Sequence, residues 1–264
     1  MSDLLNRHKD TAAIITGGGQ GVGFAIASQL VAEGCCRLVL AGRTADKIEA
    51  AAATLRKAGV DARTVKLDLA DSEACLGLIE TAVGAFGAVN ALVNAAANPG
   101  RDSIVDCTIE QFDAMFAVNV RAPFFLMQGF VKHRIAEGGG GAIVNIGSNC
   151  AHCGQSYLCS YSSSKGALVT LTKNVANGQK FNRIRCNAIL PGWMDTPGED
   201  GTQRRYHGAT DGWLVRAEAG QPMGQLAKPG QLAGLASYML SPGAGVMTGA
   251  IVDYDQQIPG SYPE

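Results

Sequence analysis

A tyrosine and a lysine stand four residues apart in this chain, downstream of a serine: they are Tyr161, Lys165 and Ser148. On a helix, that spacing puts two side chains on one face, one turn apart. A nearby ammonium favours the phenolate and lowers the pKa of a phenol from its usual value of ~10, which makes the hydroxyl an acid or base near neutral pH. The serine hydroxyl would hold a carbonyl or alcohol oxygen in line with the tyrosine.

Tyrosine and lysine are common on helices, so this pair gains weight from a glycine-rich segment near the other end of the chain. Thr16 to Gly23 reads TGGGQGVG, follows the apolar run 12–16 and opens a segment with helical spacing. Glycines allow a tight turn and a close backbone approach to a pyrophosphate, which the helix N-terminus attracts. A plain turn is the alternative, but the strand–loop–helix order favours a dinucleotide.

The end of the second predicted strand indicates which dinucleotide binds. An acidic residue at this place would bind the ribose hydroxyls of NAD, but the chain has Gly42 followed by Arg43. Glycine does not repel a 2′-phosphate and arginine can pair with one, so we expect NADP(H) to be preferred over NAD(H). A solvated arginine in a turn is the alternative. Asp68 and Asn94, which end the third and fourth strands, would lie beside the cofactor.

Apolar strand-like runs alternate with helical patterns along the chain, which predicts a single doubly wound Rossmann domain over residues 1–264. Its central parallel sheet would have helices on both faces and its ligand at the carboxyl ends of the strands. The polar segment 197–222 is predicted to be irregular. Expected strands are 12–16, 37–41, 62–67, 89–93, 142–146 and 183–190, and expected helices are 24–34, 45–59, 72–86, 109–136, 159–177 and 229–240.

Composition excludes several classes of function. The formal charge of −1 over 264 residues gives no electrostatic footprint for nucleic acid or an anionic membrane. We see no apolar window of about 18 residues, and the polar N-terminus lacks the apolar core of a signal peptide. We therefore expect a cytoplasmic protein with no nucleic-acid or membrane partner.

Eight cysteines would be free thiols in that compartment. Cys150 and Cys153 form a C-x-x-C pair around His152, for which a redox pair and half of a zinc site are the specific alternatives. No second pair completes a metal site, so we expect no metal and interpret these residues as small side chains at the rim of an active site.

Six motifs in the same order resemble the short-chain dehydrogenase/reductase (SDR) family, over essentially the whole chain. They are TGxxxGxG at Thr16–Gly23, the adenine-binding Asp68, an NNAG-like stretch at 94–97, Asn119, the Ser148 and Tyr161-x-x-x-Lys165 set, and PGxxxT at 191–196. One departure is that Ala95 and Ala97 replace the family's second asparagine and its glycine, which puts the local geometry beside the cofactor in question.

The resemblance implies hydride transfer between NADP(H) or NAD(H) and a secondary alcohol or its carbonyl. Tyr161 would be the general acid or base, Lys165 would lower its pKa and hold the ribose, Ser148 would bind the substrate oxygen, and Asn119 would hold a water linking Lys165 to solvent. The implied cofactor-binding residues are Gly17, Gly19, Gln20, Gly21, Val22, Gly23, Arg43, Asp68, Leu69, Asn94, Ala95, Ala96, Tyr161, Lys165, Pro191, Gly192, Met194 and Thr196.

Substrate contacts are expected from Ser148, Cys150, Gln155, Tyr161 and Trp193, whose polar character favours a sugar, polyol or other small hydroxylated compound. The resemblance further implies that 197–222 is a substrate lid and that 109–136 and 159–177 form the contacts of a homotetramer or homodimer. Two alternatives stay open: an epimerase or dehydratase that keeps its nicotinamide bound, and a non-catalytic nucleotide-binding regulatory protein. Net cofactor turnover excludes the first, and an effect of Tyr161→Phe on turnover excludes the second.

Overall fold

In the computed structural model, which describes residues 6–258 and 260–261, seven parallel strands form one sheet in the order β3-β2-β1-β4-β5-β6-β7. The strands are β1 (Ala12–Thr16), β2 (Arg37–Gly42), β3 (Asp61–Lys66), β4 (Ala91–Asn94), β5 (Gly141–Ile146), β6 (Ile184–Pro191) and β7 (Ile251–Tyr254). The helices are α1 (Gly21–Ala32), α2 (Ala45–Arg56), α3 (Ser72–Phe86), α4 (Ile109–Phe116), α5 (Ala122–Ala136), α6 (Cys159–Gln179), α7 (Pro197–His207), α8 (Trp213–Ala219) and α9 (Pro229–Leu240).

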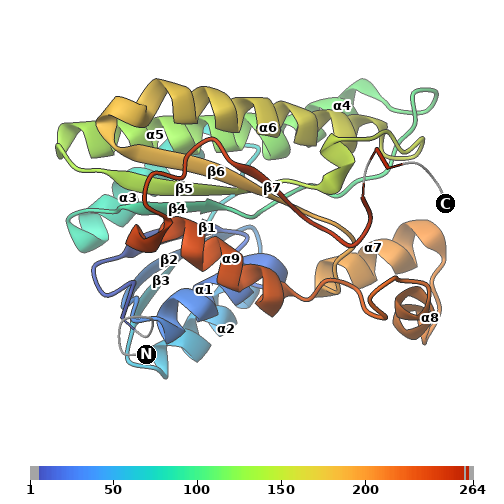
Figure 1. The fold of residues 1–264 in the computed structure, drawn as a ribbon, viewed down its shortest axis with the longest axis horizontal. Coiled ribbons are helices and arrows are strands. Elements are labelled where there is room, and N and C mark those ends of the chain that lie inside the picture. Colours follow the sequence, from blue (N-terminus) through green and yellow to red (C-terminus); the bar gives the residue numbers. More distant parts are fainter. Residues whose placement is uncertain (1–5, 259, 262–264) are drawn as a thin grey trace.

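Helices cover both faces of the sheet, which confirms the predicted fold class (Figure 1). Helices α1, α2 and α9 pack on one face around a core that includes Ile15, Leu40 and Val93. Helices α3, α5 and α6 pack on the other face around Ile14 and Leu92. Strands buried on both faces read as continuous apolar runs, and this is why the runs in the sequence predicted them.

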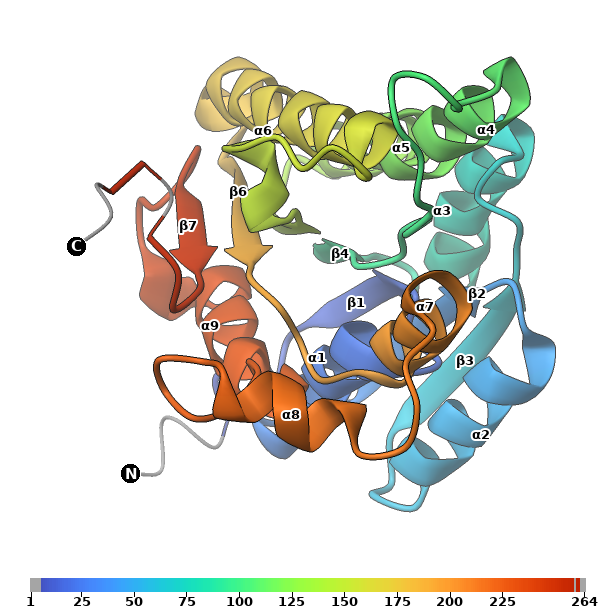
Figure 2. The ribbon, with the colours of Figure 1, turned by 90° about the vertical axis from the view of Figure 1, so that its right-hand side faces the viewer.

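The strand order reverses beside β1, which pairs with β2 on one side and with β4 on the other. All strand pairs are parallel, so every carboxyl end lies at the same edge of the sheet. A crevice outside such a reversal is the usual ligand site of open α/β sheets. Helices α7 and α8 lie beyond this edge, towards the face of the sheet that α1 and α9 cover (Figures 1 and 2).

The predicted helical stretch 109–136 is interrupted rather than continuous. Thr108 and Gln111 form a capping box that starts α4, and the helix then widens into a π-helical turn, η1 (Ala117–Arg121), before α5 begins. Such π-helical turns often mark functional positions, and this one carries Asn119. By length and composition alone this stretch could cross a membrane, but 44% of its most apolar window is buried inside the protein.

The expectation that 197–222 is irregular was wrong, because the segment forms α7 and α8. Glycines at 198 and 201 lower the helix propensity of α7, yet its ends are well made. The Thr196 hydroxyl accepts a hydrogen bond from the Glu199 N–H, Pro197 occupies the first turn, and Gly208 ends the helix in a left-handed conformation. Acidic residues in the first turn and basic ones in the last turn complement the helix dipole.

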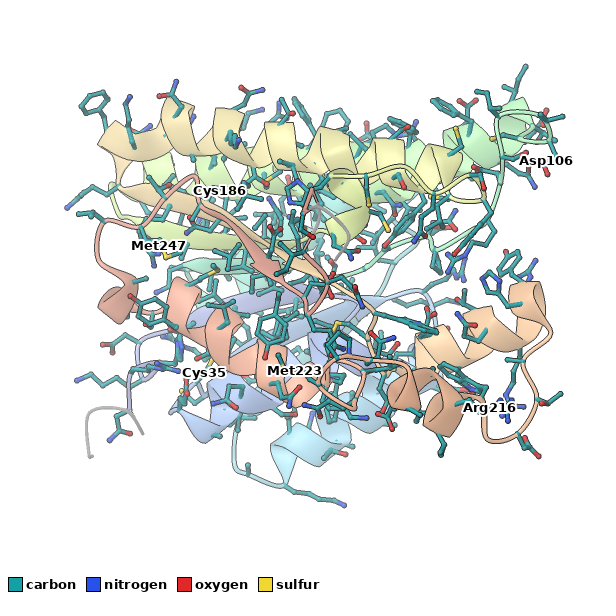
Figure 3. The ribbon with its side chains drawn as sticks, turned by 45° about the vertical axis from the view of Figure 1, so that its right-hand side comes forward. Cys35, Asp106, Cys186, Arg216, Met223 and Met247 are labelled. Atoms are coloured by element: carbon teal, nitrogen blue, oxygen red, sulfur yellow. The ribbon has the colours of Figure 1, made fainter. Side chains whose placement is uncertain are left out.

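All eight cysteines lie in the described part of the chain and are free thiols. Figure 3 marks Cys35 and Cys186, which belong to the cores on opposite faces of the sheet. Burial raises the pKa of the Cys35 thiol to about 11 and that of Cys186 to about 12. These thiols therefore behave as small apolar side chains.

Candidate active site

The glycine loop between β1 and α1 leaves space that side chains would fill. A Cβ on Gly17, whose φ is +68°, would lie 2.9 Å from the Ala96 nitrogen, and one on Gly23 would lie 2.4 Å from the Gly17 carbonyl oxygen. The first turn of α1 receives no side-chain cap from Gln20, so its N–H groups stay available to an anion. The loop therefore fits a pyrophosphate, with the backbone as the main donor.

Basic side chains lie next to this loop at the end of β2. Arg43 is exposed, and the Lys47 Nζ donates to the Gln20 Oε1 at 2.7 Å. Lys47 was missed by the sequence reasoning, because only its place on α2 brings it back to the glycine loop. A Cβ on Gly42 would lie 2.9 Å from the Ile48 Cγ2, so close helix–strand packing also favours glycine there.

Asp68 follows β3 and stays exposed, while the adjacent Leu69 is buried. The Asp68 Oδ1 accepts a hydrogen bond from the Ala70 N–H at 3.0 Å, which stabilises the turn before α3. This turn occupies one carboxylate oxygen and leaves the other for an adenine amino group. The two interpretations of Asp68, a turn residue and a cofactor contact, are therefore compatible.

The stretch 94–97, in which Ala95 and Ala97 replace the family's asparagine and glycine, is held in place by hydrogen bonds from other residues. The Thr16 Oγ1 accepts from the N–H groups of Ala95 and Ala96 at 3.2 and 3.3 Å, and the Asn94 Nδ2 donates to the Asn145 Oδ1 at 2.8 Å. Ala97 does not have the positive φ that would require glycine. Among the described residues, the Asn94 Oδ1 is one of three buried side-chain nitrogen or oxygen atoms without a hydrogen-bond partner.

Tyr161 and Lys165 lie in the first two turns of α6, as the spacing predicted, and Ser148 follows the carboxyl end of β5. Lys165 is 2% exposed, its Nζ donates to the Ile146 carbonyl at 2.9 Å, and it lies 5.7 Å from the centre of the Tyr161 ring. Ser148 is also buried, and its Oγ accepts from the Cys150 N–H at 3.2 Å. The three groups therefore meet at the carboxyl edge of the sheet.

The pKa values in this pocket differ from the sequence expectation. Desolvation raises the pKa of Tyr161 to about 12, although the Ser148 hydroxyl and the charge of Arg101 oppose the rise. Desolvation also lowers the pKa of Lys165 to about 8. Lys165 does not lower the tyrosine pKa in this state, because burial dominates both groups and the lysine ammonium binds a backbone carbonyl.

Asn119, on the π-helical turn, holds the loop that follows β4. Its Oδ1 accepts from the Asn98 N–H at 2.8 Å, and its Nδ2 donates to the Asn98 carbonyl at 3.1 Å and to the Ser164 Oγ at 3.0 Å. The Ser164 hydroxyl donates in turn to the Tyr161 carbonyl at 2.7 Å. The side chain thus joins three elements around the tyrosine, which spacing in the sequence could not reveal.

The segment that follows β6 lies against the glycine loop. A Cβ on Gly21 would lie 3.6 Å from the Thr196 Cβ and Cγ2. Pro191 ends the strand, Met194 is buried, and the Trp193 Nε1 donates to the Glu199 carboxylate at 2.7 Å. The segments expected to bind the pyrophosphate and the nicotinamide carboxamide are therefore neighbours in space.

The expected substrate contacts differ in exposure. Trp193 is 37% exposed and stacks on Trp213 of α8, with ring centres 6.2 Å apart. Cys150 is half-buried beside Ser148, whereas Gln155 is exposed in the turn before α6. The structure thus brings Cys150 and Ser148 together and leaves Gln155 further out along the rim.

The sequence reasoning did not predict the polar rim that Arg101, Tyr157 and His207 form near Tyr161. His207, at the end of α7, packs edge-on against Tyr157 with ring centres 5.4 Å apart. The Arg101 Nε donates to the His207 Nε2 at 3.4 Å, and the Arg101 Nη1 donates to the Pro99 carbonyl at 2.7 Å. Only the fold brings residues 101, 157 and 207 together, so no local pattern could have identified the rim.

Comparison with known proteins places this site in a family. The family model described as short chain dehydrogenase matches residues 11–206. Sorbitol dehydrogenase of Cereibacter sphaeroides is 32% identical, over 88% of this chain and 91% of its own length. NADP-dependent (R)-specific alcohol dehydrogenase of Lentilactobacillus kefiri is also 32% identical, over 94% of this chain and 96% of its own.

A solved structure agrees with the sequence comparisons. A variant of actinorhodin polyketide ketoreductase, crystallised with NADPH, superposes with a TM-score of 0.89 at 26% identity, covering 96% of this chain and 99% of that one. The fold, the matched family model and the two dehydrogenase relatives agree on one assignment. The chain belongs to the short-chain dehydrogenase family and is a nicotinamide-dependent oxidoreductase that acts on alcohols or their carbonyls.

Proposed function

We propose that this enzyme interconverts a small hydroxylated substrate, such as a polyol or sugar, and its carbonyl, and that it prefers NADP(H) to NAD(H). The observation that carries the proposal is the placement of the half-buried Tyr161 and the buried Lys165 beside Ser148, at the same sheet edge as the glycine loop. The nicotinamide, when bound, would accept or donate the hydride. The protein residues would orient the reactants and move the proton.

The four polar residues of the site divide these tasks. Tyr161 would exchange the proton with the substrate oxygen, and its raised pKa keeps the hydroxyl protonated at neutral pH, the form that donates when a carbonyl is reduced. Lys165 uses one donor on the Ile146 carbonyl and has two more for the ribose hydroxyls. Ser148 would bind the substrate oxygen. Asn119 would hold the water that links Lys165 to solvent, and would keep the loop around Asn98 in place.

Further cofactor contacts would come from the loops at the sheet edge. The backbone of Gly17–Gly23 would hold the pyrophosphate, Asp68 and Leu69 the adenine, 94–96 the adjacent ribose region, and 191–196 the carboxamide. Arg43 would pair with the 2′-phosphate, and Lys47 adds a second cation to that side of the loop. This pair of cations supports the preference for NADP.

The polar rim supports a hydroxylated substrate. Arg101, Tyr157 and His207 present donors and acceptors above the reacting groups, where a steroid or long acyl chain would need apolar surface. Cys150, Gln155 and Trp193 would complete the wall. Sorbitol dehydrogenase, one of the relatives, is named for such a substrate.

Residues 197–222 would act as a lid around this pocket, within one catalytic domain built on the single sheet. The contact between His207 and the opposite rim, together with the stacked Trp193 and Trp213, fits a segment that closes over a bound substrate. Its two helices would move as short rigid pieces hinged near Gly208 and Gly212, which both have positive φ.

A homotetramer or homodimer would use the outer face of α4, α5 and α6. Phe112 and Phe124 are 45% and 46% exposed there, beside a groove of about 610 Å³ lined by Phe116, Phe125 and Val120 among others. Exposed aromatic side chains next to a groove are typical of subunit contacts. We place the enzyme in the cytoplasm, with neither nucleic acid nor a membrane as a partner, from its near-zero net charge and its free thiols.

An assay with purified protein, both cofactors and a panel of polyols, sugars and secondary alcohols with their carbonyls tests the proposal. Substrate-dependent change in the absorbance of reduced nicotinamide, faster with NADP(H), is expected. Turnover confined to hydrophobic ketones would contradict the substrate class, and faster turnover with NAD(H) would contradict the cofactor preference. Bound nicotinamide without net turnover would instead favour an epimerase or dehydratase.

A further inference from the structure

Asp255, just after β7, makes a contact with the catalytic serine loop that its position in the sequence does not suggest. Its Oδ2 accepts a hydrogen bond from the Asn149 Nδ2 at 2.5 Å, across 106 residues of sequence. Its Oδ1 accepts from the N–H of the following residue, Gln256, at 2.8 Å. Both carboxylate oxygens are thus held, so the carboxylate is fixed in place.

This contact decides which way the Asn149 amide points. An ionised carboxylate accepts hydrogen bonds and does not donate them, so the amide must turn its NH₂ group towards Asp255. Its Oδ1 then faces the other side, where the Ser148 Oγ donates to it at 3.4 Å. With the Cys150 N–H donating to the same Oγ at 3.2 Å, the serine hydroxyl has one donor and one acceptor defined around it.

Asp255 also packs against the segment that follows β6. A Cβ on Gly192 would lie 1.9 Å from the Asp255 Oδ1 and 2.3 Å from its Cγ. The carboxylate therefore occupies the place where any side chain at 192 would go. The carboxylate lies between the serine loop and the segment proposed to hold the carboxamide, so a movement of either segment would displace it.

Neighbouring residues of the same segment make contacts that do not involve the Asn149 side chain. The Asp253 Oδ1 lies 2.7 Å from the His152 Nε2, and both side chains are well exposed. The Gln256 Oε1 accepts from the Met223 N–H at 2.8 Å, and its Nε2 donates to the Gln225 carbonyl at 2.7 Å. The residues before and after Asp255 therefore make hydrogen bonds that hold this segment in place.

We propose that Asp255 is a positioning residue for the proposed reaction: it orients Asn149, and through Asn149 it fixes the hydroxyl of Ser148. The serine would exchange its long bond to Asn149 for a shorter one to the substrate oxygen. Without the carboxylate the amide turns freely, and its NH₂ group competes for the Ser148 oxygen. This inference rests on the proposed function, because it concerns the hydroxyl that binds the substrate.

Four variants test the inference: Asp255→Ala, Asp255→Asn, Asn149→Ala and the double variant Asp255→Ala with Asn149→Ala. Asp253→Ala is the matched control, because it removes a contact between the same segment and the serine loop, at His152, that does not involve the Asn149 side chain. The measurements are kcat and KM on a substrate identified in the panel, the Kd of the cofactor by fluorescence titration, and Tm.

The alanine variant at 255 is expected to lower kcat about tenfold, because a loosely held group loses part of the rate that orientation supplies. Cofactor Kd and Tm should stay near the wild-type values. Asp255→Asn should recover most of the rate, since its amide oxygen can accept from Asn149 in the same place. The double variant should be no slower than the worse single variant.

Wild-type kcat in Asp255→Ala overturns the inference, as does an equal loss in Asp253→Ala, which would indicate a general effect of the segment. If the wild-type enzyme turns over no compound of the panel, the proposed function fails, and crystal structures of wild type and Asp255→Ala then decide the inference. A displaced or rotated Asn149 side chain in the variant supports it, and an unchanged contact with Ser148 overturns it.

Discussion

Lys165 should make the cofactor-free enzyme less stable than it would be with an apolar residue at the same place. Burial lowers its pKa from 10.5 to about 8. Each pKa unit corresponds to about 1.4 kcal/mol, so the buried ammonium costs about 3 kcal/mol at pH 7. Methionine has a similar length and no charge. Losing the hydrogen bond to Ile146 offsets about 1 kcal/mol, so Lys165→Met should gain about 2 kcal/mol at pH 7.

The dependence on pH follows from the direction of this shift. Between pH 8 and 10.5 the unfolded lysine keeps its proton and the folded one loses it, so the unfolded state binds more protons and stability rises with pH. The advantage of Lys165→Met should therefore shrink by about 2 kcal/mol between pH 8 and 10. Taking the difference between variant and wild type cancels other groups, including Tyr161, whose raised pKa lowers stability above pH 10.

Urea unfolding of protein stripped of nucleotide, at pH 7, 8, 9 and 10, measures both effects. Lys173→Met is the matched control, since Lys173 is exposed on the same helix, and its stability should stay within about 0.5 kcal/mol of wild type. Equal stability of Lys165→Met and wild type at pH 7 would refute the reasoning, and so would a difference that stays constant from pH 8 to 10.

Three further outcomes are expected. Gly23→Ala should weaken cofactor binding and cost about 1–3 kcal/mol of stability, because the new Cβ would lie 2.4 Å from a backbone oxygen. The control Gly84→Ala has open space around the new Cβ and should cost no stability. Equal unfolding curves for the two variants would contradict this prediction. Arg43→Ala should lower kcat/KM with NADP(H) at least tenfold relative to NAD(H), and an unchanged ratio would remove the basis of the cofactor preference. Burial lowers the pKa of His8 below 6.5, so stability should fall as pH drops below 6.5, and His8→Asn should flatten that fall in thermal unfolding between pH 5 and 7.

The parts of the fold predicted from sequence are those whose signals are local. The run AAIIT predicted β1 because a strand buried on both faces is apolar throughout. Helix α3 has the expected bounds, with a side-chain cap from Asp71 at its start and Gly87 directly after its end. Helix α7 was missed because Gly198 and Gly201 lower the helix propensity of the segment. The N-cap at Thr196, which favours a helix, forms in the structure. The π-helical turn has no local signal, since Ala-Val-Asn-Val-Arg reads as ordinary helix.

The candidate site, like the fold, could be predicted only where the signals are local. Spacing predicted that Tyr161 and Lys165 share a helix face, but their pKa values depend on burial by other elements, and the expected lowering of the tyrosine pKa was wrong for this state. Lys47 and Asp255 reach the site through tertiary contacts. A single sequence carries no information on such pairs beyond residue type, so only the fold could identify them.

We propose above that Tyr161 moves the proton in the nicotinamide-dependent reaction. Steady-state turnover of wild type and Tyr161→Phe, with cofactor Kd measured separately, tests it most directly, and Tyr238→Phe, an exposed tyrosine of α9, is the control. Tyr161→Phe should lose at least about a hundredfold in kcat while binding the cofactor nearly as tightly as wild type. Turnover by Tyr161→Phe at the rate of wild type and of Tyr238→Phe would contradict it.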